Sequence, residues 1–278
     1  RCGYLGFIIP KPFIYASNWK KLRDITLPNI QLLVDVSKVW REVKLEQCIV
    51  IFSKQPSKPN YSCNVRNLTN FIYLGEISKN LVNEFGFILN GVTPEEVALA
   101  SHLKTKCVSL SVIAGNKRGG MLQKQVSSEG EKIVLGGKHI QRWHICPDKD
   151  KKLSENIIHD SNAIIKPNSV LVQNIVAHIQ NPVDHIKIIA TVIPDESKNQ
   201  YVILDTINQL ECLPSVHPYY LCGLLNSKLV NWYVYRFLYA KAIRTMHFDS
   251  VTTDKLIIPK PEGKNCKYQN LHDKLVFL

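Results

Sequence analysis

The residues best suited to chemistry in this sequence lie between Ile133 and Ile145. There an apolar run meets the adjacent glycines Gly136 and Gly137, which make the backbone permissive. The residues that follow supply cations, an amide and flat rings, in the order Lys138, His139, Gln141, Arg142, Trp143 and His144. Such side chains bind phosphates and base edges, so the stretch indicates a surface for a polyanion. The alternative is an ordinary glycine turn before an amphipathic strand with one buried tryptophan.

The candidate binding residues are of two kinds, and none is assigned a catalytic role. Cations are expected to bind phosphate, which sets affinity and register: Lys117, Arg118, Lys138, Lys241 and Arg244. Side chains that can pair twice with a base edge are expected to read sequence: Gln141, Arg142 and Gln173. Trp143 and Trp232 are predicted to be core residues. No metal site is expected, because His139 and His144 have no third ligand nearby.

The charge of the chain is concentrated around these candidates. The formal net charge is +12, and residues 101–152 hold eleven Lys and Arg against four Asp and Glu. Residues 153–227 hold three against seven. A basic block followed by an acidic one favours one side that faces a polyanion, with nucleic acid ahead of a membrane because no amphipathic basic helix is evident. A solvated basic surface without a partner is the alternative.

The composition is that of a folded protein with buried thiols. Apolar residues make up 45% of the chain, and no apolar run is long enough to cross a membrane. The eight cysteines show no C-x-x-C spacing, which argues against a zinc ribbon, and several lie in apolar runs. We therefore expect reduced thiols in the cytoplasm rather than disulfides. The chain opens directly into an apolar strand with no signal peptide, so we expect it to begin inside a longer polypeptide.

The chain is expected to begin as the last part of an α/β sheet. A buried strand is predicted at 4–10, a helix at 16–27 with Trp19, Leu22 and Ile25 on one face, and strands at 30–36 and 46–52. A proline-rich stretch near residue 58 indicates a boundary. The predicted domains are 1–58, a connector at 59–104 and a second domain at 105–278.

The connector and the second domain are predicted from local signals. Helices are expected at 74–85 and 92–103, the second capped by Thr93 with Pro94 at its first position. The second domain should contain a strand at 108–113, a flexible cationic loop at 114–121 and a hairpin of 186–193 with 201–205. A long helix at 219–237 and a final strand at 256–261 complete it. Asn226 and Ser227, at mid-helix, are expected to bond to a neighbouring segment.

The beginning of the chain resembles the closing segment of N6-adenine DNA methyltransferases. The resemblance covers about fifty residues and consists of the strand from Gly3 to Pro10 with the following Lys-Pro-Phe, the Leu22-Arg23 pair, and the two apolar strands beyond. The family binds S-adenosylmethionine with a Phe-x-Gly-x-Gly turn and the flipped adenine with an Asn/Asp-Pro-Pro-Tyr/Phe loop. Neither motif occurs here, and Asn181-Pro-Val is not that loop. In the family both motifs lie upstream of the matching segment.

The rest of the chain resembles TaqI-type specificity domains and the target-recognition domains of type I restriction specificity subunits. The stretches that carry this resemblance are Gly137-Lys-His-Ile-Gln-Arg-Trp143, Leu221-Cys-Gly-Leu-Leu-Asn-Ser-Lys-Leu229 and Asp254-Lys-Leu-Ile-Ile-Pro-Lys-Pro261, in the family's order. Base-reading loops vary widely in that family, so the resemblance implies no particular target sequence.

Together the two resemblances imply an α/β protein in which the end of a Rossmann-like methyltransferase sheet precedes an α+β target-recognition domain. The implied partners are double-stranded DNA and an N-terminal catalytic part of the same polypeptide, with a restriction subunit or domain as a further candidate and no membrane. That missing part would use S-adenosylmethionine to methylate adenine N6, and the present chain alone should bind no cofactor and not methylate. The alternatives are a type I specificity or modification subunit, a fused restriction endonuclease–methylase, and a globular domain without a DNA role.

Overall fold

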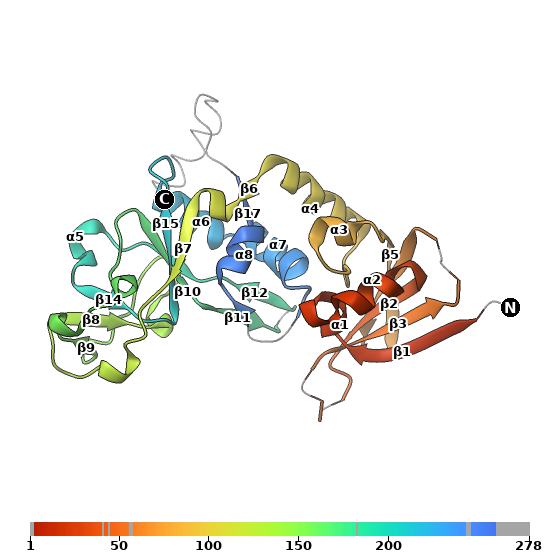
Figure 1. Cartoon of the computed structure of the whole chain (residues 1–278), viewed down its shortest axis with the longest axis horizontal. Coiled ribbons are helices and arrows are strands. Elements are labelled where there is room, and N and C mark those ends of the chain that lie inside the picture. Colours follow the sequence, from red (N-terminus) through yellow and green to blue (C-terminus); the bar gives the residue numbers. More distant parts are fainter. Residues whose placement is uncertain are drawn as a thin grey trace. The chain divides into compact units, whose positions relative to one another are not determined.

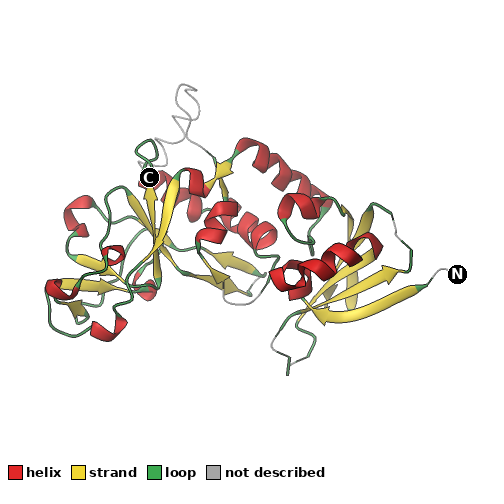
Figure 2. Ribbon diagram, in the orientation of Figure 1, coloured by secondary structure: helices red, strands yellow, loops and turns green. Residues whose placement is uncertain are grey.

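The chain folds into two compact units that both mix helices with strands (Figures 1 and 2), which confirms the α/β class. The computed structural model describes residues 3–40, 42–43, 45–55, 58–181, 183–242 and 246–259. Unit 1 comprises the described residues of 3–105 together with 233–242, and unit 2 those of 106–232 together with 246–259.

Unit 1 is built on a five-stranded sheet in the order β1-β3-β2-β4-β5. Its strands are β1 (Tyr4–Pro10), β2 (Ile30–Ser37), β3 (Gln47–Ser53), β4 (Asn60–Asn67) and β5 (Asn70–Ser78). β2 and β4 pair in parallel, and the other neighbours pair antiparallel. Two short helices, α1 (Pro12–Tyr15) and α2 (Lys20–Thr26), lie between β1 and β2 in the chain. The strands predicted at 4–10, 30–36 and 46–52 are confirmed, and two strands of the predicted connector continue the same sheet beyond residue 58.

The prediction that β1 is buried is wrong. Tyr4, Leu5, Phe7 and Ile8 are each about half exposed or more, at 74%, 55%, 49% and 50%. β1 is an edge strand that pairs with β3 alone, and its apolar residues have little cover among the described residues. The helix predicted at 16–27 is confirmed in its central part, where Leu22 and Ile25 of its apolar face are exposed whereas Trp19 is half-buried against Phe13. β1, α2 and β3 together line an apolar hollow of about 670 Å³.

The connector contains one helix that was predicted well and one that was not. α4 (Pro94–Lys106) begins with a reciprocal pair of bonds, because Thr93 Oγ1 accepts from the backbone of Glu96 at 3.2 Å and Glu96 Oε2 accepts from the backbone of Thr93 at 3.1 Å. The predicted helix at 74–85 is instead the end of β5 followed by the single turn α3 (Leu81–Phe85). Pairing with β4 overrides the local helical pattern here.

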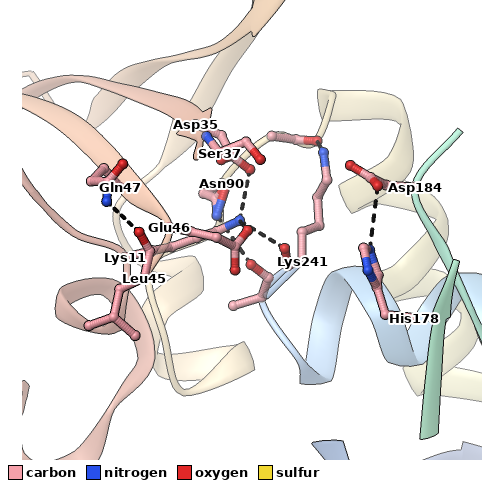
Figure 3. Close-up of polar contacts among 12 residues, drawn as sticks. Lys11, Asp35, Ser37, Leu45, Glu46, Gln47, Asn90, His178, Asp184 and Lys241 are labelled. Carbon is pink, nitrogen blue, oxygen red and sulfur yellow. Dashed lines mark hydrogen bonds and ion pairs between the residues drawn. The ribbon is translucent and has the colours of Figure 1, made fainter. Parts of the chain in front are cut away.

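A buried ion network joins the strand ends of unit 1 (Figure 3). Lys11 is 1% exposed, and its Nζ lies 3.0 Å from Asp35 Oδ2 and 3.2 Å from Glu46 Oε1. The same ammonium donates to the main-chain carbonyl of Lys241 at 2.8 Å. Burial lowers the pKa of Lys11, but the two carboxylates outweigh it and leave the pKa raised. The ammonium therefore stays protonated, and both carboxylates remain paired.

Residues 233–242 belong to unit 1 although they follow most of unit 2 in the chain. They contain the π-helix Val234–Leu238, which continues from α7 (Lys228–Tyr233). Phe237 packs on Phe85 with ring centroids 5.1 Å apart, and Arg236 Nε lies 2.7 Å from Glu96 Oε1. Asn90 donates to the carbonyl of Ala240 at 3.3 Å. The segment thus contributes apolar and polar contacts to the core of unit 1.

Unit 2 is organised around a four-stranded sheet in the order β13-β10-β15-β7. These strands are β7 (Ala114–Arg118), β10 (Ser169–Gln173), β13 (Ala190–Thr191) and β15 (Ile207–Cys212). The described residues of unit 2 form three smaller sheets as well. One pairs β6 (Val108–Ser109) with β17 (Ile257–Ile258), and a second contains β8 (Lys132–Leu135), β9 (Lys152–Leu153) and β14 (Tyr201–Ile203). The third contains β11 (Ile175–Ile179), β12 (His185–Lys187) and β16 (Met246–His247). The remaining helices are α5 (Asp195–Lys198), α6 (Pro218–Leu225) and α8 (Ser250–Lys255).

Several local predictions for unit 2 are wrong in ways that tertiary pairing explains. The predicted loop at 114–121 begins with β7, and the strand predicted at 108–113 is only the two residues of β6. The predicted hairpin does not form, because β13 pairs with β10 whereas β14 runs parallel to β8. The helix predicted at 219–237 is divided at Asn226, whose side chain bonds to both backbone groups of Ala190, at 2.9 and 3.3 Å. That bond confirms the structural role predicted for Asn226.

The described cysteines are all free thiols, and four of the six are buried: Cys48, Cys63, Cys212 and Cys222. Burial raises the pKa of Cys48, Cys212 and Cys222 to about 12. Among the residues that the structure describes, no helix is long and apolar enough to span a membrane.

Candidate nucleic-acid interface

Several of the predicted binding residues of unit 2 lie at one edge of its four-stranded sheet. β15 runs antiparallel to both β7 and β10, and β10 antiparallel to β13. Consequently β7 and β10 end at the same edge at which β15 and β13 begin. We call this the loop edge. It is defined by Arg118 and Gln173, the last residues of β7 and β10, by Ala190, the first residue of β13, and by Thr206, which precedes β15. It is the part of unit 2 at which one end of each of the four strands lies.

The Gly136–Gly137 turn is attached to the loop edge through Thr206. The backbone N–H of Gly137 donates to Thr206 Oγ1 at 2.9 Å. A side chain at Gly137 would place its Cβ 2.9 Å from the Thr206 carbonyl, so only glycine allows this approach. Position 137 therefore requires glycine because its backbone lies so close to Thr206. Gly136, with φ −109°, has an ordinary extended backbone. Gln173 fixes the same loop by donating to the carbonyl of Ile140 at 2.8 Å.

Lys138 and Gln173 line a largely apolar hollow of about 600 Å³ beside this turn. Lys138 is exposed, as a phosphate-binding cation must be, whereas its neighbour His139 is buried and also lines the hollow. His139 Nδ1 accepts from the backbone of Gly136 at 3.0 Å. Burial lowers the pKa of His139, and the charges of Lys138 and Lys151 lower it further. The imidazole is thus held neutral and helps to shape the turn.

Residues 141–144 form a tight turn that projects Trp143. Ile140 and Ile145 form a bridge, and the N–H of Gln141 donates to the carbonyl of His144 at 2.9 Å. The core position predicted for Trp143 is wrong: the side chain is 55% exposed, with φ at 75°. A bulky residue in this left-handed region is strained, and such strain is concentrated at functional sites. Trp232, the other predicted core tryptophan, is half-buried.

The two predicted base readers of this turn make contacts within the protein. Gln141 Nε2 donates to the carbonyl of Lys138 at 3.0 Å, which fixes the amide near the exposed lysine. Arg142 Nη2 donates at 2.7 Å to the carbonyl of Asn226, at the end of α6. Arg142 therefore holds the turn against α6, and its base-reading role stays a prediction.

Lys117 and Arg118 point to opposite faces of β7. Neighbouring residues on a strand alternate between its faces, so the two cations do not form one site. Lys117 lies 3.9 Å from Glu211, and Arg118 lies 3.2 Å from Asp205 at the loop edge. Of the two, only Arg118 belongs to the loop edge.

Lys241, one of the predicted phosphate ligands, makes its contacts inside unit 1. Lys241 belongs to unit 1, where its Nζ donates to the carbonyl of Gly91 at 2.9 Å and burial lowers its pKa. These contacts serve the fold and give no support to the phosphate role predicted for it. Arg244 lies outside the described residues.

A second hollow, of about 410 Å³, opens at the β7 side of the loop edge. Asparagine amides and cationic or acidic groups line it: Asn116, Arg118, Asn174, Asn208, His247, Asp249 and Ser250. Sequence reasoning missed this group because a loop was predicted at 114–121. In a loop, nothing indicates that Asn116 and Arg118 lie on the same face, as they do in the strand β7. Within the described part of the chain, no cluster of three or more His, Cys, Asp or Glu could hold a metal ion.

Comparison with known proteins reveals similarity in fold. No family model and no curated protein matches the sequence. Among solved structures, the chain is similar to the type IIL restriction-modification enzyme MmeI in complex with DNA, with 10% identity, a TM-score of 0.54, and coverage of 98% of this chain and 41% of that chain. It also matches the type IIG restriction endonuclease BpuSI (10% identity, TM-score 0.38, coverage 99% and 42%) and the HsdS subunit from Thermoanaerobacter tengcongensis (14%, 0.37, 66% and 42%). The chain thus spans less than half of each of these proteins, and the MmeI match, with a TM-score above 0.5, describes its fold.

Proposed function

We propose that this chain is the DNA-recognition part of a restriction-modification enzyme. The observation that carries the proposal is the loop edge, to which separate elements bring Arg118, Lys138 and Gln173: Lys138 and Gln173 line one hollow, and Arg118 lines the other. The exposed Trp143 lies on a turn whose backbone donates to the carbonyl of Ala190 at the same edge. Cations, an amide and an exposed ring are the groups that bind phosphates, base edges and stacked bases. The shared fold with MmeI, whose structure contains DNA, supports this proposal.

We further propose that unit 1 closes the Rossmann-like sheet of an adenine-N6 methyltransferase and that the catalytic part precedes it in the same polypeptide. The exposed apolar face of β1 supports this proposal, because an uncovered apolar edge strand promotes aggregation unless another segment packs on it. The N-terminal catalytic part would bind S-adenosylmethionine, which supplies the methyl group. The residues of the present chain would bind and orient the duplex, in the cytoplasm, where thiols stay reduced.

Each candidate residue of the loop edge has a distinct proposed task. Lys138 would neutralise a phosphate, and Gln141, held by the Lys138 carbonyl, would present its amide to a base nearby. Gln173 positions the turn through Ile140. Arg142 braces the same turn against α6. The proposed tasks are all of binding and positioning.

The salt dependence of duplex binding tests this function. The affinity of the 278-residue chain for a labelled duplex, followed by fluorescence anisotropy, should fall steeply between about 50 and 200 mM salt. Lys138→Gln should reduce the slope of log K against log salt by about one unit, since one phosphate contact is lost.

Lys20→Gln provides the control, because Lys20 is exposed in unit 1 and paired with Asp24 at 2.7 Å. This variant should bind DNA as the parent chain does. An affinity that does not change with salt over this range would contradict the proposed function.

A further inference from the structure

Asn208, which lines the hollow at the β7 side of the loop edge, has a buried acceptor that lacks a donor. Asn208 lies directly opposite Arg118 in the β7–β15 register, so the two side chains are neighbours on one face of the sheet. Asn208 is 3% exposed, and its Oδ1 has no hydrogen-bond partner among the described residues. A buried acceptor without a donor destabilises the fold, and a ligand donor that enters the hollow would remove that cost.

The carbonyl of Phe248 fixes which atom of this amide is the oxygen. A carbonyl can only accept, so the atoms that face it must be nitrogens. Asn208 Nδ2 donates to it at 2.6 Å and Asn116 Nδ2 at 3.2 Å. Asn208 Nδ2 also donates to Asn116 Oδ1 at 2.9 Å. Both amide hydrogens of Asn208 are therefore engaged, and only its acceptor remains for a ligand.

Arg118 supplies oriented donors next to this acceptor. Its Nε donates to the Asp205 carbonyl at 2.6 Å and its Nη2 to Asp205 Oδ2 at 3.2 Å. Asp205 is itself held by a hydrogen bond from Gln123. The guanidinium has five N–H donors, and three have no partner among the described residues. A carboxylate that orients the guanidinium and offsets its charge favours base reading over phosphate binding.

We propose that this hollow reads one G·C base pair from the major groove. Arg118 donates to guanine O6 and N7, and Asn208 Oδ1 accepts from the cytosine amino group. In the major groove a G·C pair presents two neighbouring acceptors followed by a donor, whereas an A·T pair presents a donor between two acceptors. An asparagine with a free amide recognises adenine by donating to N7 and accepting from N6. Asn208 cannot do so, because both of its amide hydrogens are bonded to Asn116 and Phe248. This assignment rests on the proposed DNA-recognition function.

Selection of bound duplexes from a random pool tests the assignment, with the full 278-residue chain and two variants. Arg118→Gln should lower the preference for G·C at one position by about 5- to 150-fold, and preferences elsewhere should remain. Lys117→Gln is the matched control, because it removes the same charge from the opposite face of the same strand. It should keep every preference.

The possible failures can be told apart. If Arg118→Gln weakened binding to all selected duplexes by the same factor, Arg118 would be a phosphate ligand and the assignment would be wrong. If the parent chain bound no duplex, the DNA-recognition function itself would be wrong.

Modified DNA tests the Asn208 contact without altering the protein. Replacing the selected cytosine by its 4-deamino analogue should weaken binding by the parent chain, since the donor for Asn208 Oδ1 is lost. Replacing the paired guanine by 7-deazaguanine should weaken the parent chain and leave Arg118→Gln nearly unchanged. Undiminished binding of the 4-deamino duplex would overturn the contact with Asn208.

Discussion

At the scale of single residues, Trp143 combines an exposed ring with a strained, left-handed backbone. Its ring is 55% exposed and its φ is 75°, so the strained backbone costs stability that full burial of the ring does not offset. A ring on a projecting turn can insert beside a base step or pack on the sugar. Under the proposed function we therefore expect the Trp143 ring to contact the bound duplex.

The variant Trp143→Gly should weaken binding without destabilising the fold. Glycine adopts a positive φ without strain, so the melting temperature should rise or stay unchanged. Duplex affinity should fall several-fold, measured by fluorescence anisotropy at fixed salt. Trp40→Gly, at a 45% exposed tryptophan of unit 1, is the control for loss of an exposed ring and should leave affinity unchanged. Equal affinities for Trp143→Gly and the parent chain would exclude Trp143 from the interface.

The chemistry of the loop edge could be predicted from residue types, but its geometry could not. Lys138 and Gln173 were identified from their side chains, and the structure places both beside one hollow. The separation of Lys117 from Arg118 depends on β7, whose pairing with β15 joins residues about ninety positions apart. The three hollow-lining asparagines carry no local signal, because each is an ordinary strand or turn residue until the strands meet.

At the scale of elements, α4 was the most predictable part of the fold because its start signal is local. Thr93 and Glu96 are three residues apart, and both hydrogen bonds of the capping box form without help from distant residues. The exposure of β1 was not predictable, since an apolar strand has the same sequence whether or not another segment covers it.

Removal of the cap should weaken α4 by a measurable amount. Thr93→Ala should reduce the stability of unit 1 by about 1 kcal/mol, because the N–H of Glu96 loses its acceptor. Thr93→Ser keeps the hydroxyl and should cost less than half as much. The rates of native-state amide exchange in α4, measured for the alanine and the serine variant, test this difference in stability. If the alanine and serine variants exchanged at the same rates, the hydroxyl would not be the stabilising group.

At the scale of the whole molecule, the chain passes between the two units three times. Residues 233–242 return to unit 1 and bring the Lys241 carbonyl to the buried ammonium of Lys11. The sequence did not predict that residues 233–242 belong to unit 1. The boundary predicted near residue 105 rested on local composition, which carries no information on contacts between distant segments. Contacts across 230 positions arise from the fold alone.

The buried ion network should couple this segment to the sheet of unit 1. Lys11→Met should destabilise unit 1 by about 3–5 kcal/mol, because Asp35 and Glu46 would remain buried without a counter-ion. Amide exchange should accelerate in β2 and in residues 233–242, while β15 of unit 2 keeps its protection. Lys20→Met removes an exposed ion pair and should cost about 0.5 kcal/mol or less. Faster exchange confined to β2 would show that residues 233–242 are anchored by other contacts.

If the proposed DNA-recognition function holds, the return of residues 233–242 also limits how the protein can acquire a new specificity by recombination. A single crossover near residue 105 would import a foreign copy of this segment together with the new reader. Its arginine and phenylalanine would then have to fit a carboxylate and a ring that evolved beside another sequence, and its backbone carbonyl would have to meet the buried ammonium of Lys11. A working chimera therefore requires two exchanged pieces, 106–232 and the residues from 246 onward, with the resident segment kept between them.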